Sequence, residues 1–285
     1  MPLESLKETL VELFRKTATD LPFPIESSLK AAIQEEEPGS LASYALQTIL
    51  ENITIAREKS VPLCQDTGYI TCYVHLPSEI KHREIEEALL SAEREAVERF
   101  FLRPNAVDPV SGKNSGTGIG LKHPDIHFRQ TDSKEIRFSL LLKGGGCENI
   151  GSQYKLPDVG LKAGRDLEGV RRCVLDMVNK AQGKGCAPGV LGIGIGGDRA
   201  SSYSLAKEQF FRPFDDTSPV PELAALEKRL KKEINQLGIG PMGLGGKTTV
   251  SGVKIGAIAR IPASYFVSIS YMCWAYRAGI KTIAL

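Results

Sequence analysis

The chain has 285 residues, of which 42% are hydrophobic and 25% charged, and its formal net charge is +2. This is ordinary globular composition, and the length allows a sizeable core. The near-neutral charge and the lack of a long Lys/Arg block argue against a nucleic-acid-binding protein. No run approaches the roughly 20 apolar residues of a membrane span, and the acidic, amphipathic N-terminus has no signal-peptide core. We therefore expect a cytoplasmic protein that does not enter a membrane.

Apolar periodicity predicts the elements in chain order. Helices are expected around residues 6–14, after Ser27 up to the acidic run at 35–37, at 40–59 and at 82–101. Alternating patterns predict strands at 69–75, 125–130 and 135–143, whereas 103–124 is irregular. Further helices are expected at 165–182 and 221–237, with strands at the C-terminal end. The predicted class is α+β (mixed α/β), a helical N-terminal part followed by a mixed sheet with flanking helices. With no clear linker, we treat residues 1–285 as one domain.

Six cysteines are scattered along a chain too large to need disulfide bonds: Cys64, Cys72, Cys147, Cys173, Cys186 and Cys273. In a reducing compartment such thiols are buried, catalytic or metal-bound. Three of them lie in unusual segments, PLCQDTG, GKGCAPG and YMCWAYR. Their spacing alone is weak evidence for a metal. Neighbouring glycines and prolines, however, let the backbone approach a bulky ligand closely.

Six separated motifs, which agree in order over residues 1–282, carry a specific resemblance: PLCQDTG, LRPNAVDP, KGGGCEN, GKGCAPGVLGIGIGG, GIGPMGLGGKTT and PASYFVSISYMCWA. Together they resemble the alpha subunit of class I (iron–sulfur) fumarate hydratases and of the related L-tartrate dehydratases. The resemblance implies a hydro-lyase that adds water to fumarate to give L-malate. Tartrate and mesaconate are the nearest alternative substrates, because they present the same two carboxylates.

The same resemblance implies a [4Fe–4S] cluster held by Cys64, Cys186 and Cys273. Three thiolates leave one iron open to substrate oxygen, where it acts as a Lewis acid. Asp66 corresponds to an acid/base residue of the family; a local turn is the structural alternative. Arg103 corresponds to an arginine that binds a substrate carboxylate, and an ion pair is its alternative. Gly146 matches the point where backbone approaches substrate, or is simply part of a glycine turn.

The sequence also departs from the family pattern. Cys147 replaces a serine, and we interpret it as a non-ligand close to the site. Cys72 and Cys173 are predicted to be core thiols. A histidine common in the family is missing near residue 261, so any mechanism that needs it is in doubt. The chain also lacks the second domain that completes the family's site, which implies a separate beta subunit and a hetero-oligomer.

Two other classes of function remain open. One is a sensor or scaffold that keeps the cluster without catalysis. The other is a phosphate- or nucleotide-binding protein, because Gly240 to Thr248 meets the G-x-x-x-x-G-K-[ST] spacing and Lys247 could bind an anion. The nucleotide interpretation is weakened because no strand is evident before this loop and no long helix after it.

Overall fold

The computed structural model describes residues 3–284, which form two compact units. The first unit contains the chain up to Leu21, residues 52–145 and the segment from Arg277 onward. The second contains residues 22–51 and 146–276. Both units are assembled from segments that are distant in sequence, so no single linker separates them. The predicted α+β class is confirmed, with two mixed sheets in place of one.

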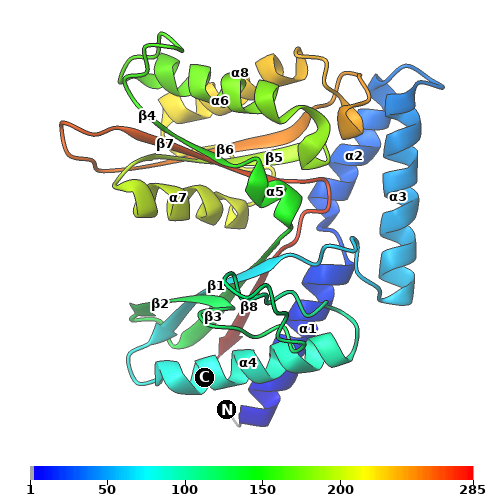
Figure 1. Ribbon diagram of the computed structural model, residues 1–285, viewed down its shortest axis with the longest axis vertical. Helices are drawn as coiled ribbons and strands as arrows, with labels where there is room; N and C mark the ends of the chain where they lie inside the picture. Colours follow the sequence, from blue (N-terminus) through cyan, green and yellow to red (C-terminus); the bar gives the residue numbers. More distant parts are fainter. Residues whose placement is uncertain (1–2, 285) are drawn as a thin grey trace. The chain divides into compact units, whose positions relative to one another are not determined.

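The first unit is built on a four-stranded sheet with the order β2-β1-β3-β8. Strands β1 and β2 are parallel, and the other neighbours are antiparallel. Helix α1 packs against helix α4 and strand β8. The elements are α1 (Leu3–Thr19), β1 (Tyr69–Pro77), α4 (His82–Glu98), β2 (Asp125–Thr131), β3 (Glu135–Lys143) and β8 (Ala278–Ala284) (Figure 1).

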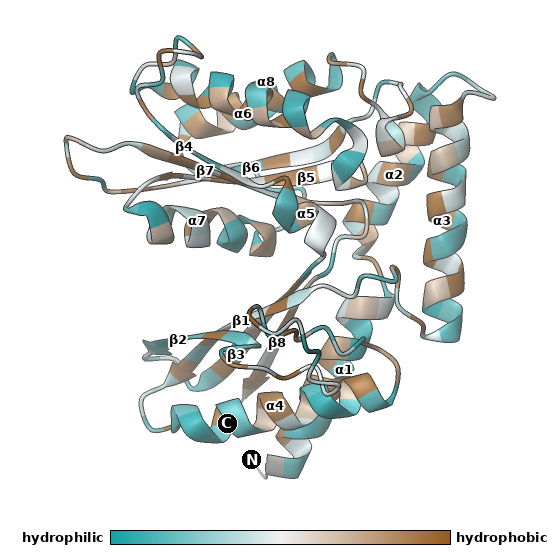
Figure 2. Ribbon diagram, in the orientation of Figure 1, coloured by the Kyte–Doolittle hydropathy of each residue, from teal (hydrophilic) through white to brown (hydrophobic). Residues whose placement is uncertain are grey.

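The core of this unit follows directly from the two periodicities of the sequence. Helix α4 buries Ile85, Leu89 and Ala92, which recur at helical spacing on one side. Strand β3 contributes Ile136 and Phe138 from alternate positions. Figure 2 shows the periodicity of α4, where hydrophobic and hydrophilic residues alternate along the helix. Burial of each of the larger side chains, Ile, Leu and Phe, contributes about 1.5–3 kcal/mol to the stability of the unit.

The second unit contains the other sheet, with the order β4-β7-β5-β6. Helices α6 and α8 cover one face and α7 covers the other (Figure 1). The strands are β4 (Ser152–Lys155), β5 (Gly189–Gly196), β6 (Val250–Ile258) and β7 (Phe266–Met272). The helices are α2 (Phe23–Glu35), α5 (Gly145–Asn149), α6 (Leu167–Ala181), α7 (Arg199–Glu208) and α8 (Pro221–Asn235), with α3 (Leu41–Lys59) beginning here; short 3-10 turns are η1 (Gln182–Gly185), η2 (Gln209–Phe211) and η3 (Pro241–Gly243).

Strand β5 is buried along its whole length and has glycines at alternate positions. A Cβ at Gly192 or Gly194 would overlap the backbone carbonyl of Ala206 or Ser202 on α7. The glycines therefore allow α7 to pack directly onto the strand.

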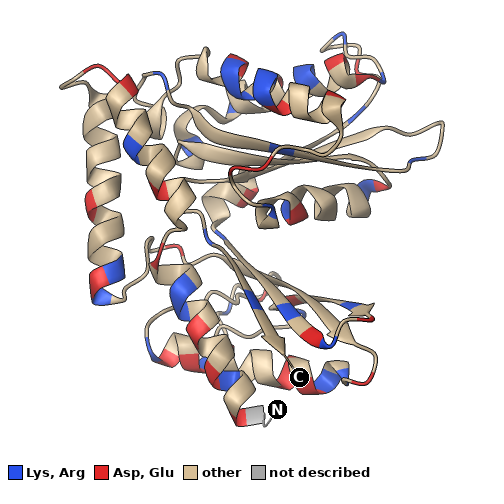
Figure 3. Ribbon diagram, turned by 180° about the vertical axis from the view of Figure 1, so that it is seen from behind, with Lys and Arg blue, Asp and Glu red and all other residues tan. Residues whose placement is uncertain are grey.

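Helix α8 carries Lys and Arg residues along its length (Figure 3).

The structure corrects some predicted boundaries. Helix α2 begins at Phe23 rather than after Ser27, because Pro24 fits the first helical turn, where its missing N–H costs nothing. The triple glycine is not a simple turn, since Gly145 and Gly146 open helix α5. Strand β4 and helix α7 were not predicted. Among the described residues, no helix combines the length and apolar character needed to span a membrane.

Candidate functional site

Cys64 lies in the first unit, at a bend in the segment between α3 and β1. The preceding residue anchors this segment. Leu63 donates its N–H to the carbonyl of Ala18 at 2.9 Å, and its own carbonyl accepts from the Asn52 amide at 2.9 Å. The Cys64 side chain is half-buried. Its position is thus fixed by two helices while its thiol stays accessible.

Asp66 is held by hydrogen bonds to both carboxylate oxygens. Oδ1 accepts from the N–H of Gly68 at 3.1 Å, which forms a local Asx turn. Oδ2 accepts from the N–H of Gly145 at 2.7 Å, at the start of α5. The predicted turn therefore exists, and it orients a half-buried carboxylate toward the triple glycine.

Arg103 is exposed at the start of the irregular segment. Its N–H donates to the hydroxyl of Thr67 at 3.1 Å, and its guanidinium donates to the carbonyl of Gln65 at 3.3 Å. Among residues 3–284, no carboxylate forms an ion pair with it, so the alternative ion-pair interpretation finds no partner. Arg103 therefore binds the short segment, residues 65–67, that contains Asp66.

Sequence reasoning missed Arg277, which is 1% exposed. Its Nη1 donates to the backbone carbonyl of Asp66 at 2.5 Å. Its Nε has no hydrogen-bond partner within the described chain. The only sequence signal was its place four residues after Cys273, at the end of the YMCWAYR motif. Arg277 therefore supports the backbone of Asp66 from a distant part of the sequence.

In the second unit, Cys186 and Cys273 lie at the same end of the sheet. Cys186 comes shortly before β5 and Cys273 directly after β7, and these strands are antiparallel, with Val190 opposite Met272. The N–H of Trp274 donates to the carbonyl of Cys186 at 3.2 Å, which joins the two loops. Two of the three predicted cluster ligands are therefore neighbours.

The two loops enclose Tyr271, which is almost completely buried. Burial raises the pKa of Tyr271 well above its usual value, and the thiols of Cys273, Cys147 and Cys186 raise it further. A Cβ at Gly189 would overlap the tyrosine ring, so this glycine is required for close packing.

Cys72 and Cys173 are enclosed in the cores of their units. Burial raises the pKa of both Cys72 and Cys173 to about 12, so each stays a neutral thiol. This confirms them as core residues. Within either unit, the described residues hold no group of three or more His, Cys, Asp or Glu side chains placed to bind a metal ion. Cys186 and Cys273 belong to the second unit, and Cys64 belongs to the first.

Gly146 lines a pocket of about 410 Å³ in the second unit, together with Lys180 and Lys184. Lys180 is paired with Asp176 at 2.7 Å. Lys184 forms no ion pair within residues 3–284, and it precedes Cys186 by two positions. Sequence analysis did not single it out. The pocket joins an exposed backbone glycine to a cation, which suits a carboxylate ligand.

The glycine-rich segment that contains Lys247 binds an internal carboxylate. The side chain of Glu36, 5% exposed, accepts from the N–H groups of Lys247 and Thr248 at 2.9 Å. Strand β6 follows this loop, where a phosphate-binding loop would lead into a helix. The geometry therefore argues against the nucleotide-binding alternative at this position.

The segment around residue 261, where the family histidine is missing, is an exposed turn between β6 and β7. Arg260 donates to the carbonyls of Ile261, Pro262 and Ser264 at 3.0–3.2 Å, and its guanidinium lies 4.8 Å from the centre of the Tyr265 ring. These contacts stabilise the turn itself.

The comparisons with known proteins bear on the whole chain. A family model described as fumarate hydratase (fumerase) matches residues 7–281. A protein of Geobacillus stearothermophilus named as a class I fumarate hydratase is 46% identical over 278 residues, which is 96% of this chain and 54% of the relative. This chain therefore spans about half the length of that relative.

Two relatives are similar over almost their full length. A protein of Methanocaldococcus jannaschii named as the alpha subunit of an L(+)-tartrate dehydratase is 38% identical over 285 residues, covering 98% of both chains. The alpha subunit of the Escherichia coli L(+)-tartrate dehydratase is 32% identical over 283 residues, covering 97% of this chain and 90% of its own.

Proposed function

Because the chain belongs to the fumarate hydratase family, we propose that it is the alpha subunit of a hydro-lyase that interconverts fumarate and L-malate. The structural observation that supports this most directly is the pairing of Cys186 and Cys273 at one sheet end. A backbone hydrogen bond joins the two loops, which supports a common ligand for the two thiolates.

We propose that Cys64, Cys186 and Cys273 hold a [4Fe–4S] cluster. When bound, such a cluster supplies an iron that accepts substrate oxygens as a Lewis acid. Cys147 is also close to Tyr271, but it is buried on α5, and the proposal keeps it as a neighbour. Cys72 and Cys173 take no part, because each is enclosed in its core.

The proposed substrate contacts come from residues already held in place. The guanidinium of Arg103 offers paired donors that match a carboxylate. Gly146 exposes backbone that a substrate can approach, and Lys184 adds a cation in the same pocket. Asp66 acts as the acid/base group beside the leaving oxygen. Hydrogen bonds from Gly68 and Gly145 fix its orientation for this role.

We further propose a beta-type partner subunit and a cytoplasmic hetero-oligomer. The two tartrate dehydratase relatives are named as alpha subunits and match this chain in length. The longer Geobacillus relative has room for a second part in the same chain. A partner would supply the remaining carboxylate-binding groups, so this chain alone should turn over poorly.

L-tartrate dehydration is the second candidate activity. It is favoured by the full-length match to the two tartrate dehydratase alpha subunits. Mesaconate hydration involves the same two carboxylates and the same class of proton transfer. The choice among these substrates depends on groups beside the reacting carbons.

The test is anaerobic co-expression with a beta-type subunit, followed by assays on fumarate, mesaconate and L-tartrate. We expect turnover of fumarate above that of the other two. Preferred turnover of tartrate would replace the fumarate assignment with the second candidate. An intact cluster with no turnover of any of the three would instead favour the sensor interpretation.

A further inference from the structure

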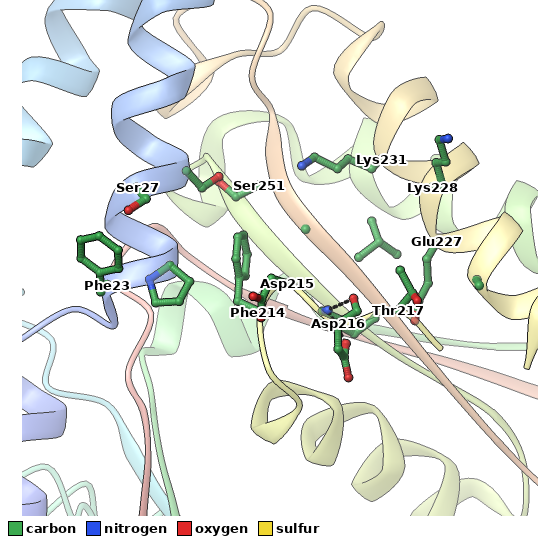
Figure 4. A pocket seen from close by; sticks show the side chains of 16 residues that line it. Phe23, Ser27, Phe214, Asp215, Asp216, Thr217, Glu227, Lys228, Lys231 and Ser251 are labelled. Carbon is green, nitrogen blue, oxygen red and sulfur yellow. Dashed lines mark hydrogen bonds and ion pairs between the residues drawn. The ribbon is translucent and has the colours of Figure 1, made fainter. Parts of the chain in front are cut away.

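A separate pocket of about 750 Å³ lies in the second unit, between α2, the segment 214–217, α8 and β6 (Figure 4). None of the residues proposed for the cluster or the substrate lines it. Its lining includes Phe23, Phe214, Lys231, Val253, Lys254 and Ser251.

Four charged groups neutralise one another beside this pocket, and three of them, Asp216, Glu227 and Lys254, line it. Arg212 pairs with Asp216 at 2.9 Å and with Glu227 at 2.8 Å, and Lys254 pairs with Asp216 at 2.6 Å. Glu227 also accepts from the N–H groups of Ser218 and Ile255. This network is satisfied internally, so it forms the wall of the pocket and offers little to a ligand.

Ser251 and Lys231 line the pocket and take no part in this network. Ser251 is 3% exposed, and its hydroxyl has no hydrogen-bond partner among residues 3–284. A buried hydroxyl without a partner costs free energy that a ligand could recover. Lys231 forms no ion pair within the described chain. In Figure 4 its side chain extends toward Ser251, whereas Lys228 points away.

Apolar groups also line the pocket. Phe23 is 76% exposed at the start of α2, an unusual position for a large aromatic side chain. Phe214 and Val253 lie further inside. An apolar lining with a few polar groups is typical of small-molecule sites.

We propose that this pocket binds a small organic anion. Lys231 and Ser251 bind its carboxylate or phosphate group, and an apolar body lies between Phe23 and Phe214. The ammonium of Lys231 supplies a charge-assisted hydrogen bond and the Ser251 hydroxyl a second donor. The site is independent of the hydro-lyase reaction, because its residues are separate from those proposed for catalysis.

The probe is phenylpropanoate, which combines one carboxylate with an aromatic body. Binding to the full chain is measured by isothermal titration calorimetry, without reference to iron content or activity. Phenylpropanol lacks the charge and inorganic phosphate lacks the apolar body. We expect saturable binding of phenylpropanoate and weaker binding of both comparison compounds. Absence of saturable binding, or equal affinity for phenylpropanol, would overturn the proposal.

Variants locate the site. Lys231→Met should weaken phenylpropanoate binding about tenfold, the effect of losing a charge-assisted hydrogen bond. Lys232→Met, the neighbouring exposed lysine outside the pocket, is the matched control and should bind normally. Ser251→Ala should also bind more weakly while folding normally, since the hydroxyl it removes has no partner. Unchanged affinity in Lys231→Met would contradict the assignment.

A second copy of the chain is the competing occupant of the same face. Light scattering measures the mass of the full chain, with Phe23→Asp for comparison. A mass that is the same in both, together with probe binding, supports the ligand site. A dimer that excludes the probe and dissociates in Phe23→Asp would assign the pocket to a protein interface and overturn the proposal.

Discussion

The backbone N–H of Gly145 lies 2.7 Å from Oδ2 of Asp66, so the first residue of α5 binds the carboxylate that follows Cys64 by two positions. The two residues are 79 positions apart in sequence. This contact connects the CQDTG motif to the triple glycine, and with the Gly68 turn it leaves the carboxylate in a single orientation. A proton-transfer group requires such an orientation.

Asp66→Asn should keep its iron but lose turnover by about 100-fold or more, because an amide cannot take up the proton. The measurements are iron content and the steady-state rate with the partner subunit. Asp108→Asn is the matched control, since Asp108 accepts similar turn hydrogen bonds from Val110 and Ser111 on the exposed segment. A rate near that of the wild type would remove Asp66 from the mechanism.

Lys184→Met should raise the KM for the dicarboxylate about tenfold with less effect on kcat, because the cation would contribute to binding before reaction. Lys180→Met provides the comparison, since Lys180 lines the same pocket but is already paired with Asp176. Equal KM values in the two variants would show that Lys184 does not contact the substrate.

Glu36→Gln should lower the free energy of unfolding by about 1.5–3 kcal/mol, because a neutral amide replaces the buried carboxylate that accepts charge-assisted hydrogen bonds from Lys247 and Thr248. Urea denaturation measures the change. Glu37→Gln, at an adjacent exposed position, should be close to neutral. The nucleotide-binding alternative is tested on the wild type. We expect that ATP does not raise its melting temperature. Stabilisation by ATP would instead revive the nucleotide-binding interpretation.

Glu93 and His123 form a buried acid–base pair in the first unit. Glu93 is 0% exposed, and its Oε1 lies 3.8 Å from Nδ1 of His123. Burial raises the pKa of Glu93 to about 8, opposed only weakly by Arg94, and burial lowers the pKa of His123. Neither side chain has a hydrogen-bond partner within residues 3–284.

The two pKa shifts predict that the stability of the fold decreases both at high pH and at low pH. The folded state holds the Glu93 proton more tightly than the unfolded chain, so stability falls as pH rises from about 4.5 to about 8, by up to roughly 5 kcal/mol. His123 stays neutral when folded, so it costs stability as pH drops through about 6.5. Glu93→Gln should abolish the loss at high pH, whereas Glu86→Gln, exposed on the same helix, should not. Urea denaturation across this range measures both, and an unchanged slope in Glu93→Gln would refute the assignment.

The sequence predicted the elements whose periodicity is local. Helix α4 and strand β3 agree closely with expectation, because one face of each carries the apolar side chains of the core. It failed where distant contacts decide the structure. Helix α7 depends on glycines of β5 for its packing, and the triple glycine becomes helical at the point where it binds Asp66.

In the candidate site, too, local motifs were predicted and contacts between distant residues were missed. The motifs identified Cys64, Cys186 and Cys273, and the loop geometry joins the last two. Arg277 was missed because only the fold brings its guanidinium to the Asp66 carbonyl. Glu36 was missed for a similar reason, since an acidic run before a proline gives no sign of the glycine loop that it binds 211 residues later.

The most direct test of the account is the iron and sulfide content of anaerobically reconstituted protein. We predict roughly four irons per chain in the wild type and in Cys173→Ser. Serine at position 64, 186 or 273 should each remove most of this iron, because a thiolate ligand is lost. Wild-type protein that takes up no iron, or a Cys186 or Cys273 variant that keeps its full complement, would contradict the account.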